Sequence, residues 1–512
     1  MLRTARTENG VVQGLPAADP RITSYKGIPF AAPPTGENRW RAPQPCKSWD
    51  GVLKAYEFAP ISVQDTPGLG NDIMEREWHV DSEVPMSEDC LYLNVWTPAK
   101  SPDEKLPVVV WFFGGGFQWG YTSAMEFDGE RFARRGIVVV TVNYRLASLG
   151  FLAHPLLTAE QPDTPTNFGL LDQREGLKWT KRNIAAFGGD PDNITIAGQS
   201  AGGGSVMAHL TSPGSDGLFQ KAIVHSALIR SPYGPTPIGP PETLEQAERK
   251  GEKLFSMLGV KTLEEARKLD PMFIRQKYAE LRQTESWMFP VNDGRFNIGD
   301  SMLLFMQGKH SRVPVMTGNT ADEFMTFIEA SSENELEAKA KDIFGDRADE
   351  FLGFEESKRK LSDKMYAGVQ ALEYTAKALI NGSREAGTTE DIYYYRFDTD
   401  IPGWDNPGNF HSVDLWFFFE TLAKCWRPFK GAHYDLSRQM CNYWTNFVKS
   451  GNPNGNDNDG SPMPEWKPYT KDAPYAMNFI TAGATPDASD ETPFGKFLIN
   501  KITDDIIKDN KE

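Results

Sequence analysis

Residues 193–210 read NITIAGQSAGGGSVMAHL, a strand-like run that passes directly into a helix-like run. NITIA is β-branched and apolar, which predicts a buried strand, and the small residues after the serine predict a helix. The turn between them, Gly198-Gln199-Ser200-Ala201-Gly202, fits the pattern G-x-S-x-G. Such a turn exposes the serine hydroxyl beside a helix N-terminus, whose N–H groups and dipole favour a negatively charged oxygen. Ser200 is therefore the candidate nucleophile.

Apolar runs of strand length recur on both sides of this stretch. VVVWFF (108–113) and IVVVTV (137–142) are continuous rather than alternating, which is typical of strands covered on both faces in a mostly parallel sheet. Helix-like segments such as 170–187 lie between the strands. The alternation predicts an α/β fold with a mostly parallel central sheet flanked by helices. Further strands are expected at 91–96, 222–224, 313–317 and 392–397.

The second half of the chain is richer in charged, amphipathic segments. We interpret them as helical insertions, approximately at 230–290 and 325–385, that cover the carboxyl edge of the sheet within a single domain of residues 1–512. Residues 232–241 contain five prolines and predict a loop. The expected helices span 242–258, 263–269, 272–282 and 333–374.

The composition restricts the kinds of binding partner and the cellular compartment that we expect for this protein. The 512 residues include 54 basic and 70 acidic side chains, a net charge of −16, and no basic cluster indicates nucleic-acid binding. No run approaches the roughly 20 apolar residues of a membrane span. The start, MLRTARTENGVVQG, lacks a signal-peptide core, and with its methionine it favours a cytoplasmic location. The cysteines, which lack zinc spacing and are expected to be free thiols, are Cys46, Cys90, Cys425 and Cys441.

A second motif lies about 85 residues before the serine. Gly114-Gly115-Gly116-Phe117 follows the strand-like run 108–113 at once. Glycines leave backbone N–H groups unobstructed, so those of Gly115 and Gly116, together with that of Ala201, are predicted to hold an oxyanion.

A serine hydroxyl needs a histidine base that a carboxylate orients. The chain has seven histidines, and four follow Ser200. In α/β-hydrolases the chain order is serine, acid, histidine. His225 follows the serine too closely for an acid to intervene, and His310 lies in the basic loop GKHSR. His411 and His433 remain as candidate bases.

The candidate acids follow a predicted strand. Asp322 and Glu323 stand just after VPVMTGN, where the carboxyl edge of a sheet carries catalytic groups. Spacing does not choose between these two residues, and it does not exclude Asp293.

Taken in order, the motifs resemble the type-B carboxylesterase/cholinesterase family of α/β-hydrolases along nearly the whole chain. The matching segments are YKGIPFAAPPTGENRWRAPQP (25–45), EDCLYLNVWTP (88–98), NYRLASLGFL (143–152), FGLLDQREGLKW (168–179), FGGDPDNITIAGQSAG (187–202) and YWTNFVKSGNPNG (443–455).

The resemblance implies a role for particular residues. The family's nucleophile falls on Ser200 and its oxyanion donors on Gly115, Gly116 and Ala201. The acid falls on Glu323 in TADEF and the base on His411 in FHSVDLWFF. The resemblance therefore favours Glu323 over Asp322 as the acid and His411 over His433 as the base. Ser226 is implied as a supporting hydroxyl.

The sequence departs from the family pattern at several positions. Phe113 replaces the histidine of HGGG, and Gln199 replaces the glutamate that commonly precedes the nucleophile, so a choline-type cationic substrate is less expected. Phe324 and Ser412 replace glycines beside the acid and the base. The family's disulfide partner for Cys90, near Ser62, is missing. Cys46 is an alternative partner, but a free thiol is favoured.

These observations predict a serine carboxylesterase that cleaves small-molecule esters through an acyl-enzyme intermediate, with no metal or organic cofactor. The substrate pocket is expected to draw on Phe117, Trp119, Trp416 and Phe417, in which case aromatic esters of feruloyl, cinnamoyl or p-nitrobenzyl type fit. The alternative is a non-catalytic adhesion or binding module on the same fold. The oligomeric state and the physiological ester are left open.

Overall fold

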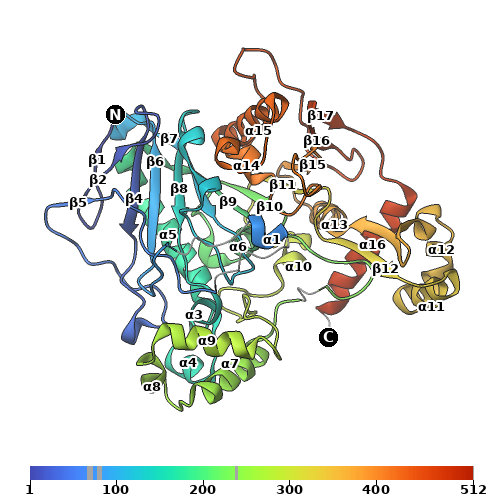
Figure 1. Ribbon diagram of the computed structural model, residues 1–512, viewed down its shortest axis with the longest axis horizontal. Helices are drawn as coiled ribbons and strands as arrows, with labels where there is room; N and C mark the ends of the chain where they lie inside the picture. The colour runs from blue at the N-terminus through green and yellow to red at the C-terminus, as the bar shows by residue number, and fades with distance from the viewer. Residues whose placement is uncertain (66–72, 78–82, 237–239, 511–512) are drawn as a thin grey trace.

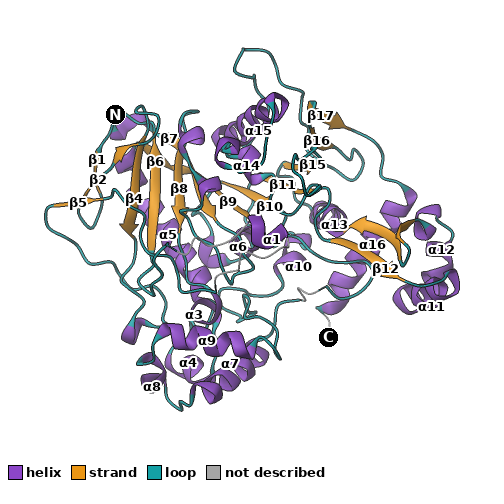
Figure 2. Cartoon of the chain, viewed as in Figure 1, coloured by secondary structure: helices purple, strands orange, loops and turns teal. Residues whose placement is uncertain are grey.

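A large mixed sheet runs through the molecule and carries helices on both faces (Figures 1 and 2). The computed structural model describes residues 1–65, 73–77, 83–236 and 240–510. Within these residues the sheet has 11 strands. In spatial order they are β17 (Gly483–Asp487), β16 (Ala476–Ile480), β15 (Ile392–Phe397), β11 (Val315–Thr320), β10 (Lys221–His225), β9 (Gly189–Gln199), β7 (Leu106–Phe112), β8 (Val138–Val142), β6 (Tyr92–Thr97), β4 (Thr23–Pro29) and β3 (Leu15–Pro16).

The predicted, mostly parallel arrangement is confirmed. The strands from β16 to β8 pair in parallel, whereas β17 at one edge and β6, β4 and β3 at the other are antiparallel. Because β9, β10 and β11 are adjacent and parallel, their carboxyl ends meet at one edge of the sheet. The residues after these three strands are therefore brought together there.

The continuous apolar strands are buried on both faces, as their sequences predict. Val109 and Trp111 of β7 enter one core, and Val108 and Val110 enter the other, because successive side chains of a strand point to opposite faces. Helices that supply the first core include α2 (Glu130–Ala133), α14 (Leu415–Phe418) and α15 (Gly431–Ser450). Helices that supply the second include α5 (Phe168–Asn183), α6 (Ala201–Leu210), α10 (Ser301–Met306), α13 (Ala371–Glu385) and α16 (Pro493–Asp509).

The helices expected between residues 242 and 282 are confirmed. They gather, together with α4 (Pro155–Glu160), at the bottom of Figure 1. Capping boxes mark two of their starts, because the Thr243 and Thr262 hydroxyls accept from backbone N–H groups three residues later. The helices are α7 (Leu244–Leu258), α8 (Leu263–Arg267) and α9 (Pro271–Leu281).

The expectation of helices throughout 333–374 is wrong. α11 (Glu333–Phe344) and α12 (Ala348–Leu352) are helical, but β13 (Lys360–Ser362) and β14 (Met365–Gln370) form an antiparallel sheet with β12 (Met325–Glu329). The pairing joins segments about 40 residues apart, so local periodicity does not reveal it. This unit packs against α16 at the right of Figure 1, through buried rings such as Phe351 and Phe497.

The start of α6 touches the end of β7 through backbone atoms. A Cβ on Gly202 would lie 2.0 Å from the carbonyl oxygen of Phe112, so only glycine fits there. Gly204, one half-turn later, has room for a methyl group, since its nearest contact would be the Phe117 ring at an ordinary van der Waals distance of 3.7 Å. The first of these glycines sets how closely the serine turn approaches the glycine loop after β7.

Gly202→Ala should destabilise the protein by about 1–3 kcal/mol, because the methyl group meets backbone that cannot move aside. Gly204→Ala is the matched control, and it should be neutral or stabilising by about 0.5–1 kcal/mol, because alanine favours a helix interior. Urea denaturation of both variants checks the pair. Equal midpoints would contradict the proposed close approach.

Candidate active site

Ser200 stands on a strained turn between β9 and α6. Its backbone has φ +55° and ψ −125°, a conformation that costs energy in any residue with a side chain. The Ser200 N–H donates to the carbonyl oxygen of His225 at the end of β10, at 2.9 Å, which holds the turn in place. Ser200 lines a large cavity, so its hydroxyl is accessible to a ligand there.

The glycine loop after β7 lies beside Ser200. Gly114, Gly115 and Gly116 all line the same cavity. Within the described residues the N–H groups of Gly115 and Gly116 donate to no acceptor, and the Ala201 N–H is in the first turn of α6, where helices have free donors. A Cβ on Gly115 would lie 2.1 Å from the Trp119 carbonyl oxygen, and its φ is +116°. The predicted oxyanion donors are thus free donors beside the serine.

Phe113, which replaces the histidine of the family pattern, is buried. Its ring stacks on Tyr144 at 4.3 Å between centroids, and the Tyr144 hydroxyl donates to the Phe113 carbonyl oxygen at 2.7 Å. The aromatic residue therefore anchors the start of the glycine loop without contributing a polar group.

Glu323 is buried and fully hydrogen-bonded. Its Oε1 accepts from the Ser226 hydroxyl at 2.6 Å and from the Thr320 N–H at 2.7 Å, and its Oε2 is hydrogen-bonded to His411 Nδ1. These bonds orient the carboxylate toward the imidazole. Ser226, which the resemblance implied as a supporting hydroxyl, occupies that position.

His411 lies on the cavity wall with its two ring nitrogens in different environments. Nδ1 faces Glu323, and Nε2 lies 3.2 Å from the side-chain nitrogen of Gln199. A proton on Nδ1 leaves Nε2 as the acceptor, which is the tautomer that a general base toward a serine requires. Among the described residues, no hydrogen bond joins the Ser200 hydroxyl to His411, and the Gln199 amide nitrogen is the group within hydrogen-bond distance of Nε2.

The other acid and base candidates have structural roles. Asp322 accepts from the Asn409 N–H at 2.7 Å and so ties the acid loop to the loop of His411. Asp293 accepts two backbone N–H groups of its own loop, at 3.0 Å each. His433 accepts from the Lys430 N–H at 2.9 Å at the start of α15. None of the three is hydrogen-bonded to His411 in the described part of the chain.

The two residues that replace family glycines both have left-handed backbone. Phe324 has φ +45° and Ser412 has φ +74°. These conformations favour glycine, so both positions store strain next to the acid and the base. The Phe324 ring packs edge-on against the His411 ring at 4.6 Å, which is a contact that glycine could not make.

The cavity has a volume of about 920 Å³. Trp119 and Trp416 line it as predicted, but Phe117 and Phe417 are not on its described wall. Phe117 packs against Phe151, and Phe417 packs against Phe397, both in the first core. The sequence interpretation missed six aromatic wall residues, which are Tyr121, Phe127, Trp287, Phe289, Phe324 and Trp426. The run SWMFP was the available signal for Trp287 and Phe289.

Comparisons with known proteins show which family the chain resembles. The model of the carboxylesterase family matches residues 2–492. The chain is 32% identical to the fumonisin B1 esterase of Sphingopyxis macrogoltabida, over 87% of this chain and 82% of that protein. It is also 32% identical to the para-nitrobenzyl esterase of Bacillus subtilis (strain 168), over 87% and 90%. A solved structure of a PNB esterase superposes with a TM-score of 0.78 at 28% identity, covering 98% of this chain and 99% of that one.

The chain belongs to the carboxylesterase family. It has the predicted α/β-hydrolase fold, and it is a carboxylic ester hydrolase. The alternative of a non-catalytic binding module is not supported, because the family's esterases are its relatives over nearly the full length.

Behind Glu323 and His411, the carboxylesterase has a buried hydrogen-bonded chain. Trp444 Nε1 donates to His225 Nε2 at 3.0 Å, so the His225 proton is on Nδ1, which lies 2.6 Å from the Tyr395 hydroxyl. The Tyr395 hydroxyl donates to Asp414 Oδ2 at 2.7 Å. His225 is therefore a structural histidine. Burial raises the pKa of Asp414 to about 7, and the nearby charge of Glu323 adds to this effect.

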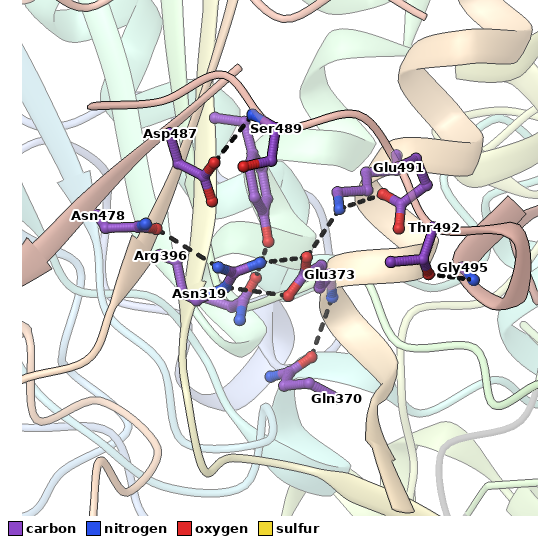
Figure 3. Close-up of polar contacts among 12 residues, drawn as sticks. Asn319, Gln370, Glu373, Arg396, Asn478, Asp487, Ser489, Glu491, Thr492 and Gly495 are labelled. Carbon is purple, nitrogen blue, oxygen red and sulfur yellow. Dashed lines mark hydrogen bonds and ion pairs between the residues drawn. The ribbon is translucent and has the colours of Figure 1, made fainter. Parts of the chain in front are cut away.

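A second buried network supports the acid loop from outside. Figure 3 shows Arg396 of β15 bonded to Glu373 of α13, and Gln370 reaching the start of that helix. The Gln370 side-chain nitrogen donates to the carbonyl oxygens of Thr320 and Glu323, at 3.1 and 3.0 Å. Gln370 thus connects the ion-paired helix to the backbone that carries the carboxylate, a link that no sequence motif indicated.

The four cysteines are free thiols, so Cys46 and Cys90 do not pair. Among the described residues, no three potential ligands of the His, Cys, Asp or Glu type cluster as a metal site would require. No described helix combines the length and apolar character needed to cross a membrane.

Asp414→Asn should change how stability depends on pH. The carboxyl's usual pKa is 3.8 and its folded value is about 7, so between these values the unfolded chain releases a proton that the folded chain keeps. Ionisation of Asp414 therefore lowers wild-type stability as pH rises through this window. An amide oxygen can still accept from Tyr395 and does not ionise.

The difference in the free energy of unfolding, variant minus wild type, should rise by roughly 2 kcal/mol from about pH 5 to about pH 8. Denaturant unfolding of both proteins at the two pH values measures the gain. A difference that is independent of pH would show that Asp414 does not titrate in this range.

Proposed function

We propose that Ser200, His411 and Glu323 form the catalytic triad of this carboxylesterase. The observation that carries the proposal is the buried Glu323 carboxylate, which bonds His411 Nδ1 on one oxygen and is fixed by Ser226 and Thr320 on the other. His411 Nε2 and Ser200 face one cavity, beside the free N–H donors of the glycine loop.

In the proposed reaction, His411 Nε2 takes the Ser200 proton while the serine oxygen attacks the ester carbonyl carbon. The N–H groups of Gly115, Gly116 and Ala201 stabilise the oxyanion, and each such donor contributes about 3 kcal/mol. His411 then protonates the leaving alcohol, which departs and leaves the acyl-serine. A water molecule, deprotonated by His411, releases the acid and restores the serine. The Gln199 amide must leave Nε2 before the first transfer, because both groups use one lone pair.

Ser200→Ala should lower kcat by several orders of magnitude, about 10⁶-fold in a comparable serine hydrolase, because no other nucleophile is positioned. Hydrolysis of p-nitrophenyl acetate and labelling by a fluorophosphonate probe measure the loss. Ser226→Ala is the matched control: it removes one hydrogen bond from Glu323 and should keep measurable turnover and labelling. Near-normal cleavage by the Ser200 variant would falsify the triad.

We further propose that the acyl side of the cavity accepts aromatic esters. Trp119 and Trp287 pack together at 5.3 Å beside Gly116, and Phe289 continues this wall. The four free thiols are consistent with the proposed cytoplasmic location.

Trp287→Ala should lower the preference for p-nitrophenyl cinnamate over p-nitrophenyl acetate by about tenfold, because an aromatic contact contributes on the order of 1 kcal/mol beyond its area. The ratio of kcat/KM values measures it. Phe417→Leu, at a core position away from the wall, is the control and should leave the ratio unchanged. A wild-type enzyme that cleaves only short aliphatic esters would contradict the aromatic preference.

A further inference from the structure

The loop that carries two of the proposed oxyanion donors has a left-handed backbone. Gly115, Gly116 and Phe117 all have positive φ, at +116°, +59° and +59°. Such conformations cost energy in a residue with a side chain, and glycine has many alternatives to them, so neighbouring groups must hold this loop in one shape. An oxyanion hole requires that shape, because its donors stabilise the transition state only when they already point at the developing charge.

Two backbone hydrogen bonds hold the peptide plane of one donor. The Gly115 carbonyl oxygen accepts from the N–H groups of Gln118 and Trp119, at 2.9 and 3.1 Å. The Gly115 carbonyl and the Gly116 N–H belong to one planar peptide, and in a trans peptide these two groups point in opposite directions. The bonds that fix the carbonyl therefore also fix the direction of the Gly116 N–H.

The side chain of Gln118 holds the next peptide of the loop. It is 2% exposed, and its Nε2 donates to the carbonyl oxygens of Gly116 and Met288, at 3.1 and 2.9 Å. Its Oε1 accepts from the Tyr278 hydroxyl at 2.8 Å, and that hydroxyl accepts from the Met288 N–H, also at 2.8 Å. Both amide hydrogens and the amide oxygen are thus bonded, so the side chain is held in one orientation.

These bonds join the glycine loop to the aromatic wall of the cavity. Met288 lies between Trp287 and Phe289, which both line the cavity. The Trp287 ring lies close to the loop, since a Cβ on Gly116 would be 3.1 Å from it. Lys250 of α7 also holds this segment, because its Nζ donates to the Trp287 carbonyl oxygen at 3.2 Å. The donors and the wall are therefore connected through one buried amide.

We propose that Gln118 is a positioning residue of the oxyanion hole, which holds Gly116 in the geometry of the transition state and connects that geometry to the aromatic wall. This inference rests on the proposed function, because it requires that Ser200 attacks an ester carbonyl beside Gly116. Gln118 is not among the described residues that line the cavity, so it acts through the loop backbone and not by touching the substrate. Loss of its amide should raise the free energy of the transition state more than that of the bound substrate.

A matched pair of ketones separates the two kinds of binding. With 1,1,1-trifluoro-4-phenylbutan-2-one, the serine oxygen adds to the activated carbonyl carbon, the serine proton passes to His411, and the carbonyl oxygen becomes an oxyanion. 4-Phenylbutan-2-one has nearly the same shape and binds without this addition. The ratio of their inhibition constants, methyl over trifluoromethyl ketone, should fall by about tenfold or more in Gln118→Met, which keeps the length of the side chain and loses its polar contacts. For p-nitrophenyl acetate, kcat should fall and KM should change little.

Gln64→Met is the matched control. Gln64 is also fully buried, and its side-chain amide bonds both the N–H and the carbonyl oxygen of Gly120, at the end of the same loop. This variant loses hydrogen bonds of the same kind without releasing Gly116, so its ratio should stay close to that of wild type. An equal fall in both variants, or an unchanged ratio in Gln118→Met, overturns the inference while ester hydrolysis stands.

Tyr278→Phe keeps the inference testable if Gln118→Met does not fold. It retains the ring and removes the hydroxyl that orients the Gln118 amide, so the same ratio should fall by about threefold. An unchanged ratio in Tyr278→Phe overturns the inference. If the wild-type enzyme binds the two ketones equally well, no oxyanion forms beside the serine, and the proposed function fails instead.

Discussion

The Glu323 carboxylate is the contact on which the site depends. It is buried, and a buried charge is tolerated only when hydrogen bonds replace its water. Those bonds come from the end of β10 through Ser226, from the end of β11 through Thr320, and from the loop before α14 through His411. Satisfying one carboxylate therefore holds three segments, far apart in the chain, at one edge of the sheet.

Support for this contact extends outward in two directions. Beneath it, Trp444, His225, Tyr395 and Asp414 form one hydrogen-bonded chain across the first core. Beside it, Gln370 at the start of the ion-paired helix α13 donates a hydrogen bond to the Glu323 carbonyl oxygen and so holds that backbone in place. The strained backbone conformations of Ser200, Phe324 and Ser412 are tolerated because these hydrogen-bonded networks fix the positions of the surrounding residues.

The cavity has two chemically different sides. Aromatic rings, Trp119 and Trp287 among them, lie by the glycine loop, whereas other parts of the described wall carry ion-paired side chains such as Arg76 and Glu77.

Local sequence was sufficient for the parallel sheet, the serine turn and the glycine loop, because continuous apolar strands and G-x-S-x-G depend on neighbouring residues alone. Chain order left more than one acid and base open, and the family resemblance then pointed to Glu323 and His411. The local sequence did not reveal the strands at 360–370, the core positions of Phe117 and Phe417, or the role of Gln370. Each of these features depends on which side chain or backbone group from a distant part of the chain lies next to it. Only the packing of the folded chain decides this, because burial and pairing are properties of contacts between segments and not of one segment alone.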